Sequence, residues 1–376
     1  MRRRQSTRVA RSGQRARQGF ISLLKILPAI LRIHGPAALG NARRFGTLLR
    51  MRFMPEEAFQ LGLFSPALRA HDIKRYLSKS ALKHLQERLN PESWAITVED
   101  KVLFYRLCRE LNILTPELYA VVYRSLPGWT REGTVPGRAS AWVEYLRKGL
   151  PAPAVLKPGW GVYGREVRIL SRAGGHFIDH AGETWTPQRL VEKMFDDPAD
   201  RGWILQEQLR NHDLLRRLSG SESLQTFRII TLAGADGTSI LHGHLKIIVG
   251  NKAIDNNERG LHGNLQAQVD CARGTLGPGV ILRTDGRGME RHTNHPTTNQ
   301  VIEGLSIPGW TQLCSFTLKV AEEFRPLQTV GWDVALTPRG PRIVEGNAWY
   351  DPPPVGQGEE IASLARALHK ERKETR

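Results

Sequence analysis

The chain has few cysteines and no long uninterrupted apolar run among its 376 residues. The three cysteines are Cys108, Cys271 and Cys314. They are far apart and form no CxxC pair, which argues against a disulfide framework or a zinc site and indicates a reducing compartment such as the cytoplasm. The apolar stretch from Phe20 to Ile33 is interrupted by a lysine and a proline, so it is too short to span a bilayer.

Acidic residues are absent from residues 1–50, which hold 12 Arg and Lys. The rest of the chain holds 42 basic and 37 acidic residues, so most of the net charge of +17 belongs to this N-terminal arm. The folded body is therefore not expected to bind nucleic acid. A signal peptide or a basic amphipathic segment on the inner membrane surface stays open, but the pattern favours a disordered arm followed by a docked helix.

Composition and residue pattern divide the chain into four parts. After the arm, residues 51–150 are mostly helical in pattern and include a linker rich in Gly, Pro and Arg at 125–139. Residues 151–365 carry short β-rich runs, and residues 366–376 form a charged tail. We expect strands at residues 118–123, 154–157, 166–170, 176–179, 203–209, 224–233 and 239–249, and helices at 98–112, 142–150, 187–195 and 311–324. Hairpins with scattered helices predict an α+β fold and not a regular βαβ array.

A β-hairpin is predicted near the C-terminal end, where two apolar-rich runs flank a turn at residues 337–341. If Leu336 faces Arg342 across this turn, the antiparallel register places Asp333 directly opposite Glu345. Two carboxylates that face each other across strands should repel, and an ordinary sheet avoids such a pair.

A divalent cation would relieve this repulsion. Asn347 lies two residues beyond Glu345 and therefore points to the same face of the predicted hairpin as Asp333 and Glu345. Two carboxylates and an amide oxygen are hard ligands that suit Mg²⁺ shared with substrate phosphates. The alternative is an exposed acidic hairpin whose charges are solvated.

A glycine-rich segment follows Lys157 and contains Gly159, Gly161 and Gly164. Its formal GxGxxG spacing would indicate dinucleotide binding only if a helix followed, but residues 165–170 alternate like a strand. A Walker loop is excluded because no GK[ST] ends the segment. A flap between two strands, with a lysine charge and glycine N–H groups facing phosphate oxygens, fits better. The alternative is a glycine-rich turn with a surface lysine.

Three further segments are candidate parts of the same site. The strand that contains Gln206, Glu207 and Leu209 could offer backbone groups to an adenine edge, and Asp213 could accept ribose hydroxyls. A core strand with a solvated end is the alternative. Arg228 and Lys246 each stand between apolar neighbours in a predicted strand. They would neutralise the phosphate being transferred if they face a cleft, and the alternative is that they are charges facing outward. The polar segment Asn251 to Asp270, with His262 as a candidate substrate contact, is either a closing loop or an ordinary surface loop.

The order of these segments resembles the ATP-grasp superfamily and, more narrowly, its sugar-transfer-associated (α-L-glutamate ligase-related) group. The resemblance covers about residues 95–360. It is carried by Val155-Leu-Lys-Pro with Gly159–Gly164, Ile204-Leu-Gln-Glu207, Thr226-Phe-Arg-Ile-Ile-Thr231, Gly331-Trp-Asp-Val-Ala335 and Ile343-Val-Glu-Gly-Asn347. It implies two α+β halves that clasp ATP between antiparallel sheets, with a helical region before them.

The resemblance also implies roles for individual residues. Lys157 and Lys101 would contact the nucleotide, Gln206 to Leu209 would form the adenine hinge, and Asp213 would take the ribose position. Asp333, Glu345 and Asn347 match metal ligands that usually hold two Mg²⁺ ions. The sequence departs from the pattern at Asp213, where many relatives have Glu, and in the polar loop, where adjacent glycines are expected.

The resemblance implies a ligase that phosphorylates a carboxylate with ATP and lets an amine attack the acyl phosphate. The substrates would be small molecules, and the name of the group suggests that they are linked to cell-surface sugars. Two alternatives stay open. Some ATP-grasp relatives are kinases that phosphorylate a hydroxyl, and a non-catalytic, nucleotide-binding scaffold at the membrane would work through the basic arm.

Overall fold

The computed structural model describes residues 22–36, 42–74, 76–161, 164, 166–197, 199, 202–256 and 263–353. The first 21 residues of the basic arm, the charged tail and His262 lie outside these residues, so the predictions for them stay predictions. The described chain begins with a helix at residues 22–34, and its Ile30 is buried. None of the described helices is both long enough and apolar enough to cross a membrane.

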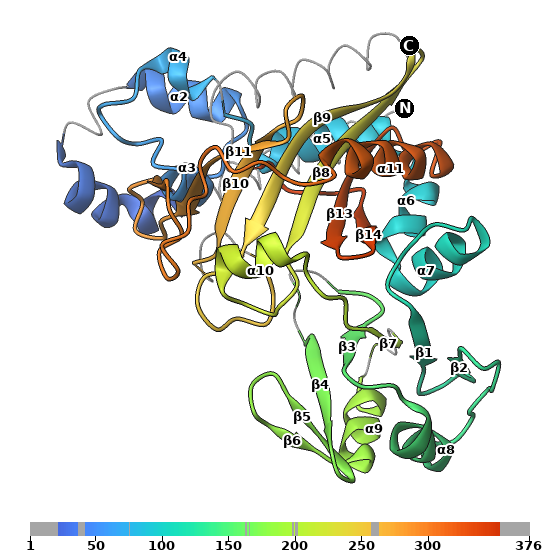
Figure 1. The fold of residues 1–376 in the computed structure, drawn as a ribbon. Helices are drawn as coiled ribbons and strands as arrows, with labels where there is room; N and C mark the ends of the chain where they lie inside the picture. Colours follow the sequence, from blue (N-terminus) through green and yellow to red (C-terminus); the bar gives the residue numbers. More distant parts are fainter. Residues whose placement is uncertain are drawn as a thin grey trace, which may run out of the picture.

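Two antiparallel sheets of seven strands each form the body of the molecule (Figure 1). The first sheet has the order β2-β1-β7-β3-β4-β5-β6 and belongs to the lower lobe in the figure. Its strands are β1 (Leu118–Val122), β2 (Trp129–Thr130), β3 (Ala154–Pro158), β4 (Arg168–Ala173), β5 (His176–Asp179), β6 (Thr184–Trp185) and β7 (Trp203–Glu207). Because β1 pairs with β7, one sheet crosses the domain boundary that the sequence suggests near residue 150.

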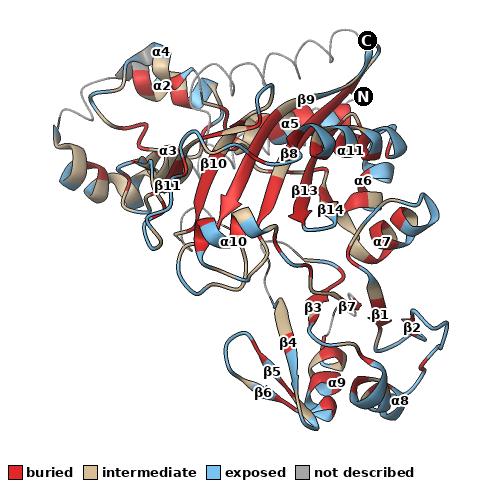
Figure 2. Cartoon of the chain, viewed as in Figure 1, coloured by how far each residue is buried: buried red, intermediate tan, exposed pale blue. Residues whose placement is uncertain are grey.

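The second sheet has the order β12-β11-β10-β9-β8-β13-β14. Its strands are β8 (Thr226–Gly234), β9 (Gly237–Ile247), β10 (Leu265–Asp270), β11 (Thr275–Leu282), β12 (Met289–His292), β13 (Thr329–Thr337) and β14 (Gly340–Asn347). Its central strands are buried along most of their length, and every residue of β13 is buried (Figure 2). The two faces differ, because Phe227 and Ile229 join the hydrophobic core with α11 (Trp310–Glu323), whereas Thr226 and Arg228 line a cavity on the other face.

Helices α6 (Glu92–Glu99) and α7 (Lys101–Glu110) contact β14 and hold the edge of the second sheet. Asp100 begins α7, and its carboxylate accepts a hydrogen bond from the Leu103 N–H at 3.0 Å. The other helical elements are α2 (Ala42–Arg50), α3 (Pro55–Gln60), α4 (Ala70–Ile73), α5 (Lys79–Leu89), α8 (Ala139–Glu144), the π-helix η2 (Tyr145–Gly149), α9 (Pro187–Phe195) and α10 (Asp213–Ser219).

The α+β prediction agrees with this architecture, and β5 and α9 have the bounds expected from the sequence. Five strands were missed. β10, β11 and β12 lie in a part assigned to a polar loop or left unassigned, β2 lies in the segment expected to be a linker at 125–139, and β6 was left unassigned. β11 contains Gly277, Pro278 and Gly279, which suggest a break. A Cβ at Gly279 would lie 3.1 Å from Ile302 and 3.2 Å from Leu265, so this glycine allows close packing inside the sheet.

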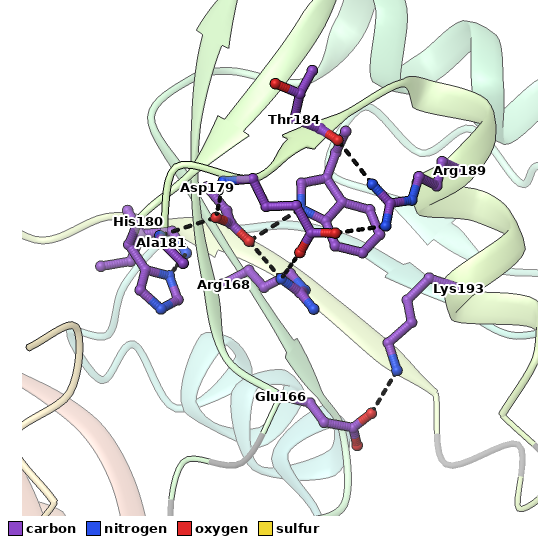
Figure 3. A network of polar contacts seen from close by, with 11 residues as sticks. Glu166, Arg168, Asp179, His180, Ala181, Thr184, Arg189 and Lys193 are labelled. Atoms are coloured by element: carbon purple, nitrogen blue, oxygen red, sulfur yellow. Dashed lines mark hydrogen bonds and ion pairs between the residues drawn. The ribbon is translucent and has the colours of Figure 1, made fainter. Parts of the chain in front are cut away.

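A polar network stiffens the lower lobe behind the glycine-rich segment (Figure 3). The buried Asp179 carboxylate accepts from Arg168 and from the Trp185 indole N–H at 3.0 Å. The guanidinium carbons of Arg168 and Arg189 lie 4.2 and 4.1 Å from the centroid of the Trp185 ring. Glu166 follows the glycine-rich segment in the sequence, and its carboxylate accepts a hydrogen bond from Lys193 on α9 at 2.8 Å. This ion pair connects the end of the flap to helix α9.

The N-terminal helices dock on the β11–β12 hairpin through a close glycine contact. Gly62 has a φ of +69°, and a Cβ there would lie 2.9 Å from Gly288 Cα, while a Cβ at Gly286 would overlap the ring of Phe59. We expect Gly62→Ala to lower the free energy of unfolding by about 1–3 kcal/mol beyond the backbone cost alone, measured by chemical denaturation. Gly133→Ala is the control, because Gly133 also has a positive φ but no atom within 4 Å. Equal losses in both variants would show that this contact does not hold the helices in place.

Candidate functional site

The predicted pairing of the two carboxylates is confirmed. Asp333 on β13 lies directly opposite Glu345 on β14, and Gly331 lies opposite Asn347. All three polar side chains therefore share one face of the hairpin and line the same cavity. The Asn347 amide nitrogen donates to the Gly331 carbonyl at 3.2 Å.

The predicted turn of this hairpin was wrong by one residue. Leu336 pairs with Pro341 and not with Arg342, and Thr337 pairs with Gly340. The two residues between Thr337 and Gly340 therefore form the whole connection between the strands. A β-bulge with Val344 as its extra residue then restores the register. Bulges of this kind redirect side chains beside functional sites, and this one brings the two carboxylates face to face.

Asp333 lies between two cations. Arg228 Nε and Nη2 donate to the two carboxylate oxygens at 2.6 and 3.0 Å, and Lys246 Nζ lies 2.9 Å from Oδ2. Burial acts to raise the pKa of Asp333, but the two cations outweigh it and hold this pKa well below its usual range. The expectation that a divalent cation relieves this repulsion is therefore corrected, because Arg228 and Lys246 already neutralise the Asp333 carboxylate.

Lys157 is buried at the end of β3 and is linked to the acidic hairpin through Tyr105. Its Nζ donates to the Tyr105 hydroxyl at 3.2 Å, and that hydroxyl donates to the carbonyl of the bulge residue Val344 at 2.8 Å. The pKa of Lys157 is lowered to about 7, chiefly by burial; Glu345 and Asp333 act to raise it, and Lys101 acts to lower it. A lysine held near neutrality beside two carboxylates is poised to gain a proton when an anion arrives.

Lys101 joins the glycine-rich segment to the hairpin directly. Its Nζ donates to the Gly161 carbonyl at 2.9 Å and lies 3.7 Å from Glu345 Oε2, while its backbone N–H donates to the Gly159 carbonyl at 3.0 Å. Gly161 and Gly164 line the cavity, whereas Gly159 is not among the lining residues. Gly164 has a φ of +66°, and a Cβ there would lie 2.8 Å from Ile254, so this position requires glycine.

The adenine and ribose candidates lie at the end of β7, where the ladder stops at Glu207. Gln206, Glu207 and Leu209 line the cavity. The Glu207 carboxylate pairs with Arg339 at 2.8 Å, and the Glu207 backbone N–H donates to the Glu117 carbonyl at 2.8 Å. Asp213 does not line the cavity, because its exposed carboxylate pairs with Arg216 in the first turn of α10. Its ribose role stays a prediction without support from this geometry.

The charged side chains meet in one cavity of about 1590 Å³. The four cations Lys101, Lys157, Arg228 and Lys246 surround the two carboxylates of Asp333 and Glu345. The same wall carries the carboxyl groups of Glu99 and Asp255, so the four cations face four acidic side chains, and burial raises the pKa of both Glu99 and Asp255. Four cations grouped in a partly closed cavity can hold a polyphosphate. Both parts of the site that the sequence suggested are therefore brought together.

Sequence reasoning missed three residues of this cavity wall and the tyrosine that contacts Lys157. Tyr105 follows a helical pattern and gives no sign of its contact with Lys157. Glu99 accepts from the Ala348 and Trp349 N–H groups, and Asp255 accepts from the Thr226 N–H and hydroxyl at 2.7 and 2.6 Å. His244 is buried beside His242, with ring nitrogens 3.1 Å apart. A half-buried Asp in the sequence Asp-Asn-Asn looks like an exposed turn, because sequence alone does not show that it accepts hydrogen bonds from Thr226 at the start of β8.

The fold and this cavity define an ATP-grasp protein. A family model described as sugar-transfer associated ATP-grasp matches residues 80–365. The chain belongs to this family, which confirms the resemblance and the fold class inferred from the sequence. No curated protein sequence matches the chain.

Solved structures with a similar fold are distant in sequence. They include an L-amino acid ligase from Bacillus licheniformis, with 12% identity, a TM-score of 0.34, and 67% of this chain and 40% of that chain covered. The ATP-grasp ligase PsnB complexed with a minimal precursor has 12% identity, a TM-score of 0.39, and coverage of 75% and 63%. N5-carboxyaminoimidazole synthase from Aspergillus clavatus has 8% identity, a TM-score of 0.35, and coverage of 72% and 51%. The chain thus spans less than two thirds of the length of each of these proteins.

Proposed function

We propose that the chain is an ATP- and Mg²⁺-dependent ligase that joins a carboxylate to an amine. The contact of Lys101 with both Gly161 and Glu345 carries the proposal, because it places the glycine-rich flap and the acidic hairpin in one cavity. Membership of the ATP-grasp family supports the use of ATP, and the ligases among the similar structures support the reaction class. The family description further supports a substrate that is linked to a sugar.

The donor set fits a magnesium ion. Asp333, Glu345 and Asn347 offer hard oxygen atoms, and the nitrogen of the Asn347 amide is already used on Gly331, so its oxygen is the atom left for a cation. Asp333 Oδ2 accepts from both Arg228 and Lys246, but Oδ1 accepts from Arg228 alone and keeps a further lone pair for a cation. These three residues would hold the metal against the phosphates.

A buried amide supports a base-binding position at the other end of the same site. Gln206 is 4% exposed, and its Oε1 has no hydrogen-bond partner within the described part of the chain. A buried acceptor without a donor costs about 1–3 kcal/mol, which a ligand N–H at this position would recover. The exocyclic amine of adenine is such a donor, and Gln206 lies on the strand predicted to form the hinge.

The remaining side chains have roles that follow from charge and burial. When bound, the nucleotide would supply the phosphoryl group that activates the carboxylate. Lys157 and Lys101 would hold phosphate oxygens, while Arg228 and Lys246 would orient the carboxylate and offset the negative charge that develops on transfer. Their fixed contacts with Asp333 place these cations before substrate arrives, so little reorganisation is needed.

The proposal predicts ADP release that requires Mg²⁺ when the purified chain is given ATP with pooled sugar acids and amino acids. Glu345→Gln should lower the rate by about tenfold to a hundredfold, because weakened metal ligation has effects of this order. Glu110→Gln, on the exposed end of α7, is the matched control and should leave the rate unchanged. ADP release is followed by coupled assay, and products by mass spectrometry.

The products decide the reaction class. An amide formed together with ADP and free phosphate is the expected result. A phosphorylated acceptor formed with ADP and without free phosphate would contradict the ligase and identify a kinase. ADP release that is absent with every acceptor pair, or unchanged in Glu345→Gln, would contradict the catalytic role of the site.

A further inference from the structure

The cavity extends well beyond the charged cluster. Its volume of about 1590 Å³ exceeds the roughly 300–1,000 Å³ of an ordinary ligand pocket. The extension crosses the second sheet away from β14, over β9, β10, β11 and β12, and continues under the N-terminal helices, whose residues line its far end. In Figure 1 these helices lie beside β10 and β11, away from the lower lobe.

The chemistry of the sheet surface changes along this path. Asp333 on β13 lies opposite Arg228 on the neighbouring strand β8. The second cation that contacts Asp333 is Lys246, which lies on the next strand, β9. Lys246 lies directly opposite Gln266 on β10, so both side chains share the cavity face. Beyond Gln266, Leu282 on β11 pairs with Met289 on β12, and both line the cavity. The floor therefore passes from charged, to amide, to apolar.

The roof at the far end combines apolar and charged side chains. The lining residues that α2, α3 and the turns after them contribute include Leu48, Phe53, Met54, Leu61 and Phe64. The same elements also contribute Arg52, Glu56, Glu57 and Gln60. A nucleotide whose phosphates bind the cations does not need to contact this surface, because the surface lies beyond the strands that carry those cations. A second ligand with an apolar part gains about 0.8 kcal/mol for each methylene that it buries here, a factor of about three to four in affinity.

Gln266 marks the boundary between the two regions. It is 9% exposed, and its Oε1 has no hydrogen-bond partner within the described residues. This is the second buried amide oxygen without a donor in the described cavity wall, and it lies on the second sheet, whereas Gln206 lies on the first. A buried acceptor of this kind fits an N–H or O–H group on a ligand.

We propose that the carboxylate substrate is an amphiphile with a polar donor group beside its carboxylate and an apolar chain behind it. The carboxylate lies against Lys246 and Arg228, the neighbouring hydroxyl or amide N–H donates to Gln266 Oε1, and the chain lies between β11–β12 and the N-terminal helices. This inference rests on the proposed ligase function, since the reacting carboxylate has to meet the phosphates at Arg228 and Lys246.

The test is a binding series that does not need turnover. Hexanoate, octanoate and decanoate are titrated into the full-length chain with a non-hydrolysable ATP analogue and Mg²⁺, below their micelle concentrations, and binding is followed by calorimetry. Affinity should rise about threefold to fourfold per methylene. In addition, 2-hydroxydecanoate should bind at least about tenfold more tightly than decanoate, because it supplies the donor for Gln266. Equal affinities across the series, with the ATP analogue bound, would overturn the inference and leave the proposed function intact.

Variants locate the two parts of the amphiphile. Gln266→Leu should abolish the preference for 2-hydroxydecanoate while keeping the dependence on chain length. Met289→Glu and Met54→Glu place a charge at the apolar end and should flatten the chain-length dependence, and two positions guard against one variant failing to fold. Leu126→Glu is the control, because Leu126 is exposed and does not line the cavity.

A chain-length dependence retained in both Met variants would overturn the placement of the apolar chain of the ligand. Failure of the wild-type chain to bind the ATP analogue would instead contradict the proposed function itself.

Discussion

Asp333→Asn is expected to lower the free energy of unfolding by about 3–5 kcal/mol near neutral pH. Asn is almost the same size as Asp, so the loss comes from charge and not from packing. The substitution leaves Arg228 and Lys246 buried without their shared anion, and removing one partner of a buried ion pair has an effect of this size. Urea denaturation at neutral pH measures it.

The pH dependence gives this prediction a second check. Because Arg228 and Lys246 depress the pKa of Asp333 in the folded state, the stabilisation is present above the unfolded pKa of about 3.9 and is lost as the pH falls through the folded value. The difference between wild type and Asp333→Asn should therefore shrink below about pH 4. Asp270→Asn is the control, because Asp270 pairs with Arg273 in an exposed position and should lose little. A loss in Asp333→Asn no larger than that of the control would contradict the buried ion triad.

Lys157→Met is expected to weaken binding of ATP by about tenfold to a hundredfold. A charge-assisted hydrogen bond contributes about 1.5–3 kcal/mol, and the methionine keeps the length of the side chain without its charge. The pKa of about 7 adds a specific feature: above pH 7 the free protein holds Lys157 largely neutral, and bound phosphate favours its charged form. Binding at pH 8 should therefore take up a proton, and affinity should fall as the pH rises above 7.

Calorimetry in buffers of different ionisation enthalpy measures this proton uptake. Wild type should show it at pH 8, and Lys157→Met should lose most of it. Lys193→Met is the matched control, because Lys193 is also a lysine of the lower lobe but pairs with Glu166 outside the cavity. Proton uptake that persists in Lys157→Met would assign it to another group and contradict the role of Lys157.

The sequence predicted most of the site because its strongest signals are local. The pairing of Asp333 with Glu345 was predicted correctly because two errors cancelled: the turn was placed one residue away, and the bulge at Val344, which the alternation does not show, shifts the register by the same amount. The lysine and glycines of the flap form one segment, and the strand predicted after them disfavoured the Rossmann alternative. The superfamily resemblance then supplied the order of the segments.

Contacts between distant segments could not be predicted in this way. Tyr105 and Val344 are 239 positions apart, and no local pattern in either segment predicts their hydrogen bond. The charge balance of Asp333 was misjudged for the same reason, since Arg228 lies 105 positions away. Strands β10 to β12 were missed because glycine, proline and polar residues outweighed a weak alternation, and with them the whole extension of the cavity was missed.

The central claim is that the glycine-rich flap and the acidic hairpin hold one triphosphate through a metal ion. A crystal structure with a non-hydrolysable ATP analogue and Mn²⁺, which gives an anomalous signal, tests this claim most directly. We expect a Mn²⁺ peak about 2.0–2.2 Å from oxygens of Asp333, Glu345 or Asn347 and from the phosphates, with Lys157 against the same phosphates. A nucleotide bound away from Lys157, or a metal bound away from these three residues, would contradict the account.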